Sequence, residues 1–142
     1  MRGYHGMPEA TAEVLDSDGW FRTGDMGQLD NDGYLSITGR IKEMLIVGGE
    51  NVFPREIESV LESHPDVDAC GVIGRTDEKR GEVPVAFVEL RDGSSSQPSE
   101  LRLWSSDRLA PYQCPREIVI VENLPRNPTG KVQRRELQAL LS

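Results

Sequence analysis

The chain has 142 residues, of which 37% are hydrophobic and 28% are charged, so it is long enough to bury the core of one ordinary domain. Twenty-four acidic residues against 16 basic residues give a formal net charge of −8, which argues against general binding to nucleic acids or anionic membranes. The longest apolar runs, such as Met44–Val47, are far shorter than the roughly 20 residues of a transmembrane helix. The first residues show no charged-then-apolar pattern, so we expect no secretory signal peptide in them.

The two cysteines and two histidines suggest no metal site. Cys70 and Cys114 are far apart and form no Cys-x-x-Cys pair, so we expect neither a zinc site nor a disulfide framework. Cys70 lies in an apolar, strand-like run, which favours a buried thiol. His64 stands at an expected helix end, where capping is a better interpretation than catalysis. We assign no catalytic role to His64 or to His5.

Basic residues gather near the C-terminal end of the sequence. Residues 126–135 contain four bases and no acid: Arg126, Lys131, Arg134 and Arg135. An acidic protein with one basic corner is suited to a small anion rather than to a polyanion. Charge alone, however, favours a solvated helix start.

The first forty residues differ from the rest. Residues 1–25 are rich in Gly, Pro, Asp and Thr and have little periodicity. A hairpin is predicted next, with strands at 27–30 and 34–38 joined by an Asn-Asp-Gly turn at 31–33. Residues 39–40 form a plausible domain boundary.

Strand and helix patterns alternate after this boundary. In chain order we expect a buried strand at 44–47, a helix beginning at Pro54, strands at 67–73 and 83–90, a helix capped by Ser99, a strand at 118–121 and a final helix carrying Leu137, Leu140 and Leu141. These elements predict an α+β fold in which helices flank a small mixed sheet.

Two segments carry residue types that simple packing does not require. Residues 19–25 place Asp25 behind a Thr-Gly turn, where its two carboxylate oxygens can accept hydrogen bonds from two neighbouring hydroxyls, as in a ribose. Ordinary turn chemistry is the simpler alternative. Residues 39–58 contain the pair Gly48–Gly49, which allows a thin chain or a phosphate to approach the backbone, or simply provides a turn with positive φ.

A third segment, residues 124–137, places Lys131 after a glycine on a loop that leads into a cationic helix start. The spacing is not that of a phosphate-binding P-loop. A lysine in this position can bring a compact positive charge onto an oxyanion, although most lysines at a helix start are merely exposed.

Taken together and in this order, these segments resemble signature blocks of the C-terminal part of the adenylate-forming superfamily. This superfamily includes the AMP-forming acyl-CoA synthetases and the luciferase and peptide-synthetase adenylation domains. The resemblance covers the whole chain and rests on four stretches: MRGYHGMPEAT (1–11), GWFRTGD (19–25), GRIKEMLIVGGENVFPREIE (39–58) and PRNPTGKVQRREL (125–137). The GGENVFPREIE block resembles fatty-acyl and aryl CoA ligases more than peptide synthetases.

The resemblance implies roles for four residues in the first half-reaction, in which a carboxylate attacks the α-phosphorus of ATP and pyrophosphate leaves. Asp25 matches an aspartate that binds the ribose hydroxyls, and Arg40 an arginine that contacts ribose and phosphate. Lys42 occupies the hinge about which the small C-terminal domain rotates. Lys131 matches the catalytic lysine.

In the second half-reaction of similar enzymes, the domain rotates and a glycine-containing surface lines the tunnel for the thiol. The matching residues here are Gly48, Gly49, Glu50 and Asn51. The resemblance therefore implies ATP, Mg²⁺ and CoA as cofactors, held mainly by the larger domain. It also implies a small carboxylic acid as substrate, by default a fatty acid, with an aryl or short-chain acid as the alternatives. We expect no metal ligands in this chain, and a cytoplasmic location.

The expected domains are residues 1–41, the tail of a large N-terminal adenylation domain, and residues 42–142, the complete C-terminal lid. The Gly/Ser/Thr-rich ATP loop and the acyl pocket of the family are not in this sequence, so the chain alone is expected to be inactive and its N-terminal domain to be its first partner.

The sequence departs from the family's Tyr-Lys-x-Pro pattern, because the matching residues here are Tyr112-Gln113-Cys114-Pro115. Two alternatives are an adenylation domain that loads the pantetheine of a carrier protein and a stand-alone regulatory lid module.

Overall fold

The computed structural model describes residues 1–141, and the chain divides into two units, Met1–Lys42 and Glu43–Ser142. The predicted boundary lies one residue before this division. That the first unit is the tail of a larger domain stays a prediction. Within residues 1–141, no helix combines the length and the apolar composition that crossing a bilayer requires.

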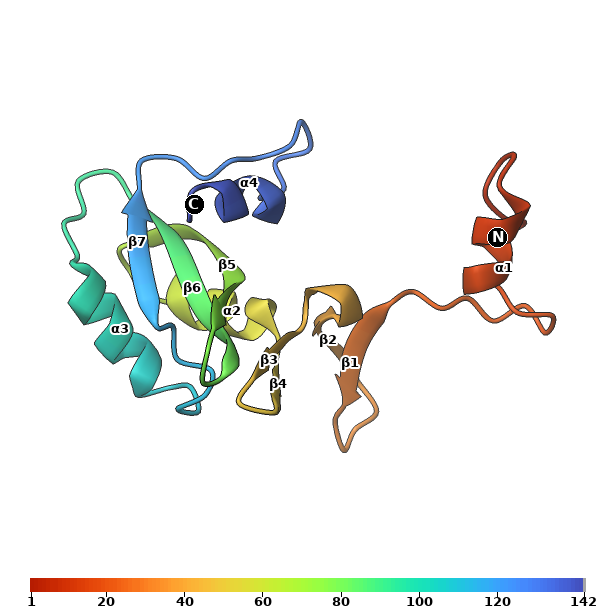
Figure 1. The fold of residues 1–142 in the computed structure, drawn as a ribbon, viewed down its shortest axis with the longest axis horizontal. Coiled ribbons are helices and arrows are strands. Elements are labelled where there is room, and N and C mark those ends of the chain that lie inside the picture. The colour runs from red at the N-terminus through yellow and green to blue at the C-terminus, as the bar shows by residue number, and fades with distance from the viewer. Residues whose placement is uncertain (142) are drawn as a thin grey trace. The chain divides into compact units, whose positions relative to one another are not determined.

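The first unit contains one short helix and one hairpin (Figure 1). Helix α1 (Pro8–Val14) begins with a proline in its first turn and carries Glu9 there, and both residue types are favourable at a helix N-terminus. Sequence periodicity does not predict this helix, because none of its residues is buried and no apolar stripe marks one face.

The predicted hairpin is confirmed. Strands β1 (Asp25–Leu29) and β2 (Leu35–Arg40) pair antiparallel. The Asp30 carboxylate accepts hydrogen bonds from the backbone N–H groups of Asp32 (2.9 Å) and Tyr34 (2.8 Å). Gly33 has a φ of +87°, which a residue with a side chain rarely adopts. Local turn chemistry therefore determines this hairpin.

The second unit is built on a mixed five-stranded sheet with the order β4-β3-β6-β5, in which β7 also pairs with β6. The strands are β3 (Leu45–Val47), β4 (Glu50–Val52), β5 (Val67–Asp77), β6 (Gly81–Leu90) and β7 (Glu117–Val121). The β6–β7 pair is parallel and the other pairs are antiparallel. Strand β6 thus holds the sheet together.

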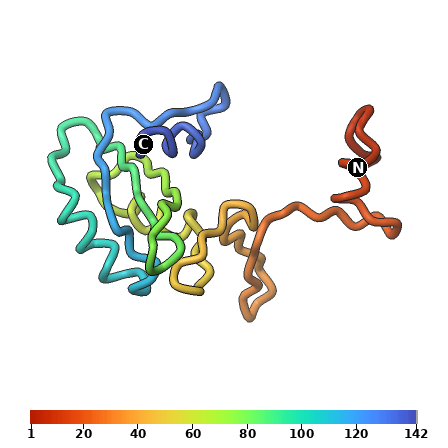
Figure 2. Tube along the Cα trace, viewed as in Figure 1, coloured from red at the N-terminus to blue at the C-terminus, as the bar shows by residue number. Residues whose placement is uncertain are grey.

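Helices α2 (Pro54–Glu62), α3 (Pro98–Ser106) and α4 (Arg134–Ala139) cover this sheet. Successive side chains of a strand point to opposite faces, and β6 uses this alternation to build two cores. Ala86 and Val88 lie in the core that α2 and α3 close, whereas Val85 and Phe87 lie in the core that Leu137 of α4 closes. Figure 2 follows the long connection from β7 to α4. The predicted α+β fold is confirmed.

Two local predictions are wrong. Helix α3 starts at Pro98 after an N-cap at Gln97, not at Ser99, because Pro98 needs no hydrogen-bond acceptor and the Glu100 carboxylate accepts the N–H of Gln97 (2.8 Å). The segment 44–47 is buried on one face only, since Ile46 is exposed.

Strand β4 was not predicted, because three residues that carry two polar side chains do not give a strand pattern.

Candidate functional site

In the first unit, the structure brings together two of the residues predicted from the sequence. Asp25 begins β1, Arg40 ends β2, and the strand register places them opposite each other. The Arg40 Nε lies 3.0 Å from Asp25 Oδ1, and both side chains are partly exposed. Carboxylate oxygens can accept from a sugar diol, and a guanidinium can donate to a phosphate, so this pair suits a nucleotide.

Lys42 lies in a short 3₁₀ helix, η1 (Ile41–Glu43), and is exposed. It is the last residue of the first unit. Its role as a hinge stays a prediction.

The Gly48–Gly49 pair forms the two-residue turn of a tight hairpin between β3 and β4. Val47 pairs with Glu50, and the two glycines have φ values of +61° and +91°, as a type I′ turn requires. A Cβ built on either glycine would meet no atom within 4 Å. Glu50 and Asn51, the other residues predicted for this surface, are exposed on β4. The turn therefore presents open backbone.

A polar pocket of about 200 Å³ adjoins this turn, and the sequence did not predict it. We call it the arginine pocket; its lining includes Val47, Arg80, Arg102, Pro111, Tyr112, Cys114 and Arg116. Its arginines come from the β5–β6 turn, from α3 and from the residue before β7, so no sequence spacing reveals the cluster. Within residues 1–141, none of the three arginines takes part in an ion pair. In a protein of net charge −8, such a group is a candidate anion site.

The departure from the Tyr-Lys-x-Pro pattern lies beside this pocket. Gln113 replaces the lysine and turns toward α2, where its Nε2 donates to the Glu56 carboxylate (2.8 Å) and its Oε1 accepts from the Ala110 N–H (3.1 Å). Burial raises the pKa of the Cys114 thiol, and the charge of Arg102 opposes this shift. The pocket thus keeps its arginines but has no lysine from this motif.

Lys131 is exposed at the end of a tight loop before α4. Arg126 and Val132 pair as an isolated β-bridge, and the backbone of Asn127 and Lys131 is joined by an N–H···O=C bond of 2.9 Å. The loop is therefore a closed hairpin. Among the hydrogen bonds and ion pairs of residues 1–141, none includes the Lys131 ammonium, which leaves it available to a ligand.

Arg134 accounts for part of the basic corner. Its guanidinium bonds the carboxylates of Glu58 (2.7 Å) and Glu43 (2.9 Å) and the carbonyl of Val72 (3.2 Å). Glu58 is buried, and burial raises its pKa even though Arg134 and the N–H of Val72 act in the other direction. Arg126 likewise pairs with Glu89 (3.3 Å). The solvated helix start that charge alone favours is thus wrong for Arg134, whereas Arg126 stays exposed in its ion pair.

The Lys131 loop and the glycine turn lie at different ends of the second unit. Figure 1 places the loop before α4 at one end of the sheet and the β3–β4 turn at the other. One compact unit therefore presents two separate surfaces, one with the exposed Lys131 ammonium and one with open backbone beside an arginine cluster.

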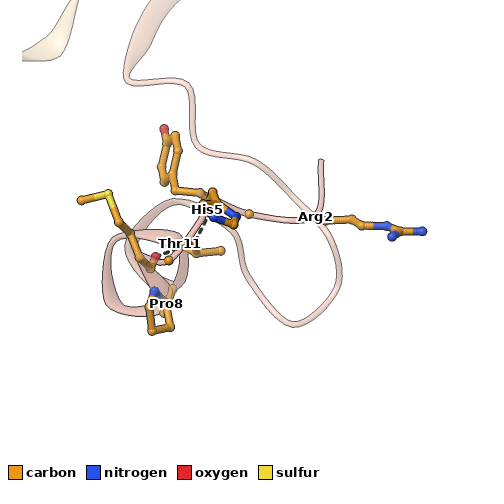
Figure 3. A pocket seen from close by; sticks show the side chains of 9 residues that line it. Arg2, His5, Pro8 and Thr11 are labelled. Carbon is orange, nitrogen blue, oxygen red and sulfur yellow. Dashed lines mark hydrogen bonds between the residues drawn. The ribbon is translucent and has the colours of Figure 1, made fainter.

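A wider pocket of about 600 Å³ lies in the first unit beside the start of α1 (Figure 3). The Thr11 hydroxyl, in its lining, accepts from the Tyr4 N–H (2.9 Å) and donates to the Met7 carbonyl (2.8 Å). Arg2 points away from the other labelled side chains in Figure 3. The pocket gathers no group of charges, and we assign no chemistry to it. In residues 1–141, no cluster of three or more His, Cys, Asp or Glu side chains is placed to hold a metal ion.

Comparison with known proteins shows the family of this chain. A profile of the AMP-binding enzyme C-terminal domain family matches residues 56–131. The chain is 49% identical over 140 residues to the 2-succinylbenzoate–CoA ligase of Geobacillus kaustophilus, 46% identical over 138 residues to a feruloyl-CoA synthase of Amycolatopsis sp. and 46% identical over 135 residues to the fatty acid–[acyl-carrier-protein] ligase ScoC of Streptomyces coeruleorubidus. These matches cover 99%, 97% and 95% of the chain, but only 28%, 28% and 26% of the relatives.

Solved structures agree in fold. The amide bond synthetase McbA from Marinactinospora thermotolerans matches with a TM-score of 0.92 at 39% identity, covering 100% of this chain and 29% of that one. ATP-bound MatB from Rhodopseudomonas palustris matches with a TM-score of 0.86 at 37% identity, covering 98% of this chain and 28% of that one. The family profile spans more than half of the chain, and the fold agrees with it along almost the whole length. The chain belongs to the family of AMP-binding enzyme C-terminal domains.

Proposed function

We propose that this chain is the lid of a longer enzyme that joins a carboxylic acid to CoA through an acyl-adenylate. The observation that carries the proposal is that one unit presents the free Lys131 at one end and the glycine turn with the arginine pocket at the other. Two such surfaces suit an enzyme with two successive half-reactions. The curated relatives, two of which are CoA ligases, support this assignment.

In the first half-reaction, a carboxylate oxygen bonds to the α-phosphorus of ATP, the bond to the β-phosphate oxygen breaks, and pyrophosphate leaves. Asp25 accepts hydrogen bonds from the ribose hydroxyls while Arg40 holds it and donates to phosphate. Negative charge develops on the carboxylate and α-phosphoryl oxygens, and the Lys131 ammonium neutralises it. Mg²⁺ is proposed to enter with ATP; no residue of this chain is assigned to it.

In the second half-reaction, the second unit turns about Lys42 and exchanges one surface for the other. The glycine turn then borders the path of the thiol, because its backbone leaves room for a thin pantetheine arm. The CoA sulfur bonds to the acyl carbon and AMP leaves. The arginine pocket, next to this turn, binds the phosphates of CoA.

The arginine pocket favours free CoA over a carrier protein as the acyl acceptor. CoA carries a pyrophosphate and a 3′-phosphate, whereas the pantetheine arm of a carrier protein carries a single phosphate ester. Three arginines without an ion pair in the described part of the chain suit the larger charge. We propose a carboxylic acid as the substrate class, and a fatty acid as the first substrate to test. We also propose a cytoplasmic location, where ATP and CoA are supplied.

Replacing an arginine of the pocket should weaken CoA binding and leave adenylation intact. Hydrogen bonds to charged groups contribute about 1.5–3 kcal/mol, so Arg102→Gln and Arg116→Gln should each raise the KM for CoA roughly 10- to 100-fold. Steady-state thioester formation with CoA, dephospho-CoA and pantetheine measures this. Arg91→Gln is the matched control, since Arg91 lies outside the pocket. Equal losses with pantetheine and with CoA would show that the arginines do not bind phosphate.

A domain exchange tests the proposed function. The chain replaces the matching 140 residues of the Geobacillus kaustophilus ligase, and thioester formation by the chimera is compared with that of the ligase lacking this part. We expect the chimera to exceed the truncated ligase by about 10²-fold or more, because the lid supplies the adenylation cation. The 142-residue chain alone should form no thioester.

A folded chimera that is as inactive as the truncated ligase would contradict the proposal and favour the stand-alone regulatory module. A chimera that releases pyrophosphate but acylates only a carrier protein would support the other alternative acceptor.

A further inference from the structure

We propose that Asn127 is the residue that positions Lys131 for adenylation, an inference that rests on the proposed function. Its side-chain Oδ1 accepts three hydrogen bonds: from the Thr129 N–H (3.0 Å), from the Thr129 hydroxyl (2.7 Å) and from the Lys131 N–H (2.8 Å). One amide oxygen thus organises the entire turn that ends at Lys131.

Backbone contacts fix the two sides of this turn around Asn127. Its N–H donates to the Lys131 carbonyl (2.9 Å), and its carbonyl accepts from the Gly130 N–H (2.8 Å). Asn127 and Lys131 therefore face each other through both main chain and side chain. Gly130 adopts a φ of +82°, which the sharp return of the chain requires.

The Asn127 turn is itself attached to the sheet. The Glu89 carboxylate of β6 accepts from the Leu124 N–H (3.0 Å) and pairs with Arg126 (3.3 Å). A second guanidinium nitrogen of Arg126 donates to the Gly130 carbonyl (3.3 Å). Hydrogen bonds and ion pairs thus connect strand β6 to the turn that carries Lys131, and Asn127 is the last side chain in this series.

Lys131 needs such support because nothing in the described residues holds its own side chain. A lysine has a flexible four-carbon stem, and the ammonium is exposed. Its position relative to a reacting phosphate is then set by where the backbone places its Cα. A displacement of about 1 Å at a reacting group can cost roughly 10²-fold in rate.

The test compares Asn127→Ala with Asn127→Asp in the chimera described above. Aspartate has the same shape and only acceptors, and no hydrogen bond in residues 1–141 uses the Asn127 NH₂ group, so Asp keeps all three bonds. We expect Asn127→Ala to lower kcat for pyrophosphate release about 10- to 100-fold with little change in KM for ATP, and Asn127→Asp to stay within about 3-fold of the unchanged chimera. Thioester formation from pre-made acyl-adenylate should be unaffected in both.

A second readout needs no activity. In the 142-residue chain, hydrogen exchange at the Lys131 amide should accelerate in Asn127→Ala but not in Asn127→Asp, while the amides of β6 stay protected. Asn123→Ala is the matched control, because Asn123 lies in the same connection and its side chain makes no hydrogen bond in the described residues. If Asn127→Ala does not fold, Asn127→Ser, whose short hydroxyl cannot reach all three donors, should give an intermediate loss of adenylation.

The outcomes separate this inference from the proposed function. Loss of adenylation in Lys131→Ala with none in Asn127→Ala overturns the inference and keeps the function. Equal loss of both half-reactions in Asn127→Ala, or no rescue by Asp, also overturns it. No effect of Lys131→Ala overturns the proposed function itself.

Discussion

In the domain-exchange chimera, replacing Lys131 by alanine is expected to lower ATP-dependent pyrophosphate release by about 10²–10³-fold. This is the usual effect of removing a group that stabilises charge in a transition state. The ammonium is exposed, makes no ion pair in the described residues and stands on a turn held by Asn127. It therefore contributes little to folding, and its removal should act on the chemistry. Thermal unfolding of Lys131→Ala should match that of the unchanged chain.

Two controls sharpen this prediction. Arg135→Ala removes another exposed cation from the first turn of α4 that makes no ion pair in residues 1–141, and it should leave pyrophosphate release unchanged. Lys131→Arg keeps the charge but places it on a planar group of different reach, so it should rescue only a small part of the rate. A general effect of positive charge would instead give equal losses in Lys131→Ala and Arg135→Ala.

Replacing Arg134 by methionine is expected to destabilise the second unit by about 3–5 kcal/mol, because the buried Glu58 loses its nearest cation and keeps only the more distant Arg55 (3.9 Å). The free energy of unfolding in urea measures this. The double variant Arg134→Met/Glu58→Met removes both charges and should recover much of the loss. Unfolding of Arg134→Met at the urea concentration of the unchanged chain would contradict the structural role.

The same variant should show a defined pH dependence. Burial already raises the pKa of Glu58, and removing Arg134, which opposes this shift, raises the pKa further. The folded state then binds the proton more tightly than the unfolded state, so stability falls as the pH rises through the interval above the ordinary carboxyl pKa. Lowering the pH from neutral toward the ordinary carboxyl pKa should therefore reduce the difference in the free energy of unfolding between Arg134→Met and the unchanged chain.

Local chemistry explains which elements the sequence predicts. The β1–β2 hairpin follows from an Asp-Gly turn, and α2 follows from a proline at its start and from Ile57 and Leu61 on one face. Strand β4 and helix α1 have no such pattern. Residues 50–52 form strand β4 because they pair with β3, with Val52 opposite Leu45. This pairing is a tertiary contact, and a pattern of three residues does not predict it.

The site divides in the same way. The sequence proposes Asp25 and Arg40 separately, but their ion pair depends on the register of β1 and β2. Arg80, Arg102 and Arg116 gather from three elements, so only the fold reveals the arginine pocket. Conversely, the charge pattern of residues 126–135 suggests a single basic surface, but the structure pairs Arg134 with the buried Glu58 and the exposed Arg126 with Glu89.

A lid with two surfaces for two half-reactions is tested most directly by a crossed pair of variants in the domain-exchange chimera. Pyrophosphate release and thioester formation from pre-made adenylate are measured for Lys131→Ala and Gly49→Ala. A Cβ added at Gly49 would contact nothing within 4 Å, so Gly49→Ala acts only on an incoming ligand or through backbone strain. Gly93→Ala, at a φ of +80° and in equally open space, controls for that strain.

We predict that Lys131→Ala slows only the first reaction, Gly49→Ala only the second and Gly93→Ala neither. Slowing of the same half-reaction by Lys131→Ala and Gly49→Ala would contradict the two-surface lid.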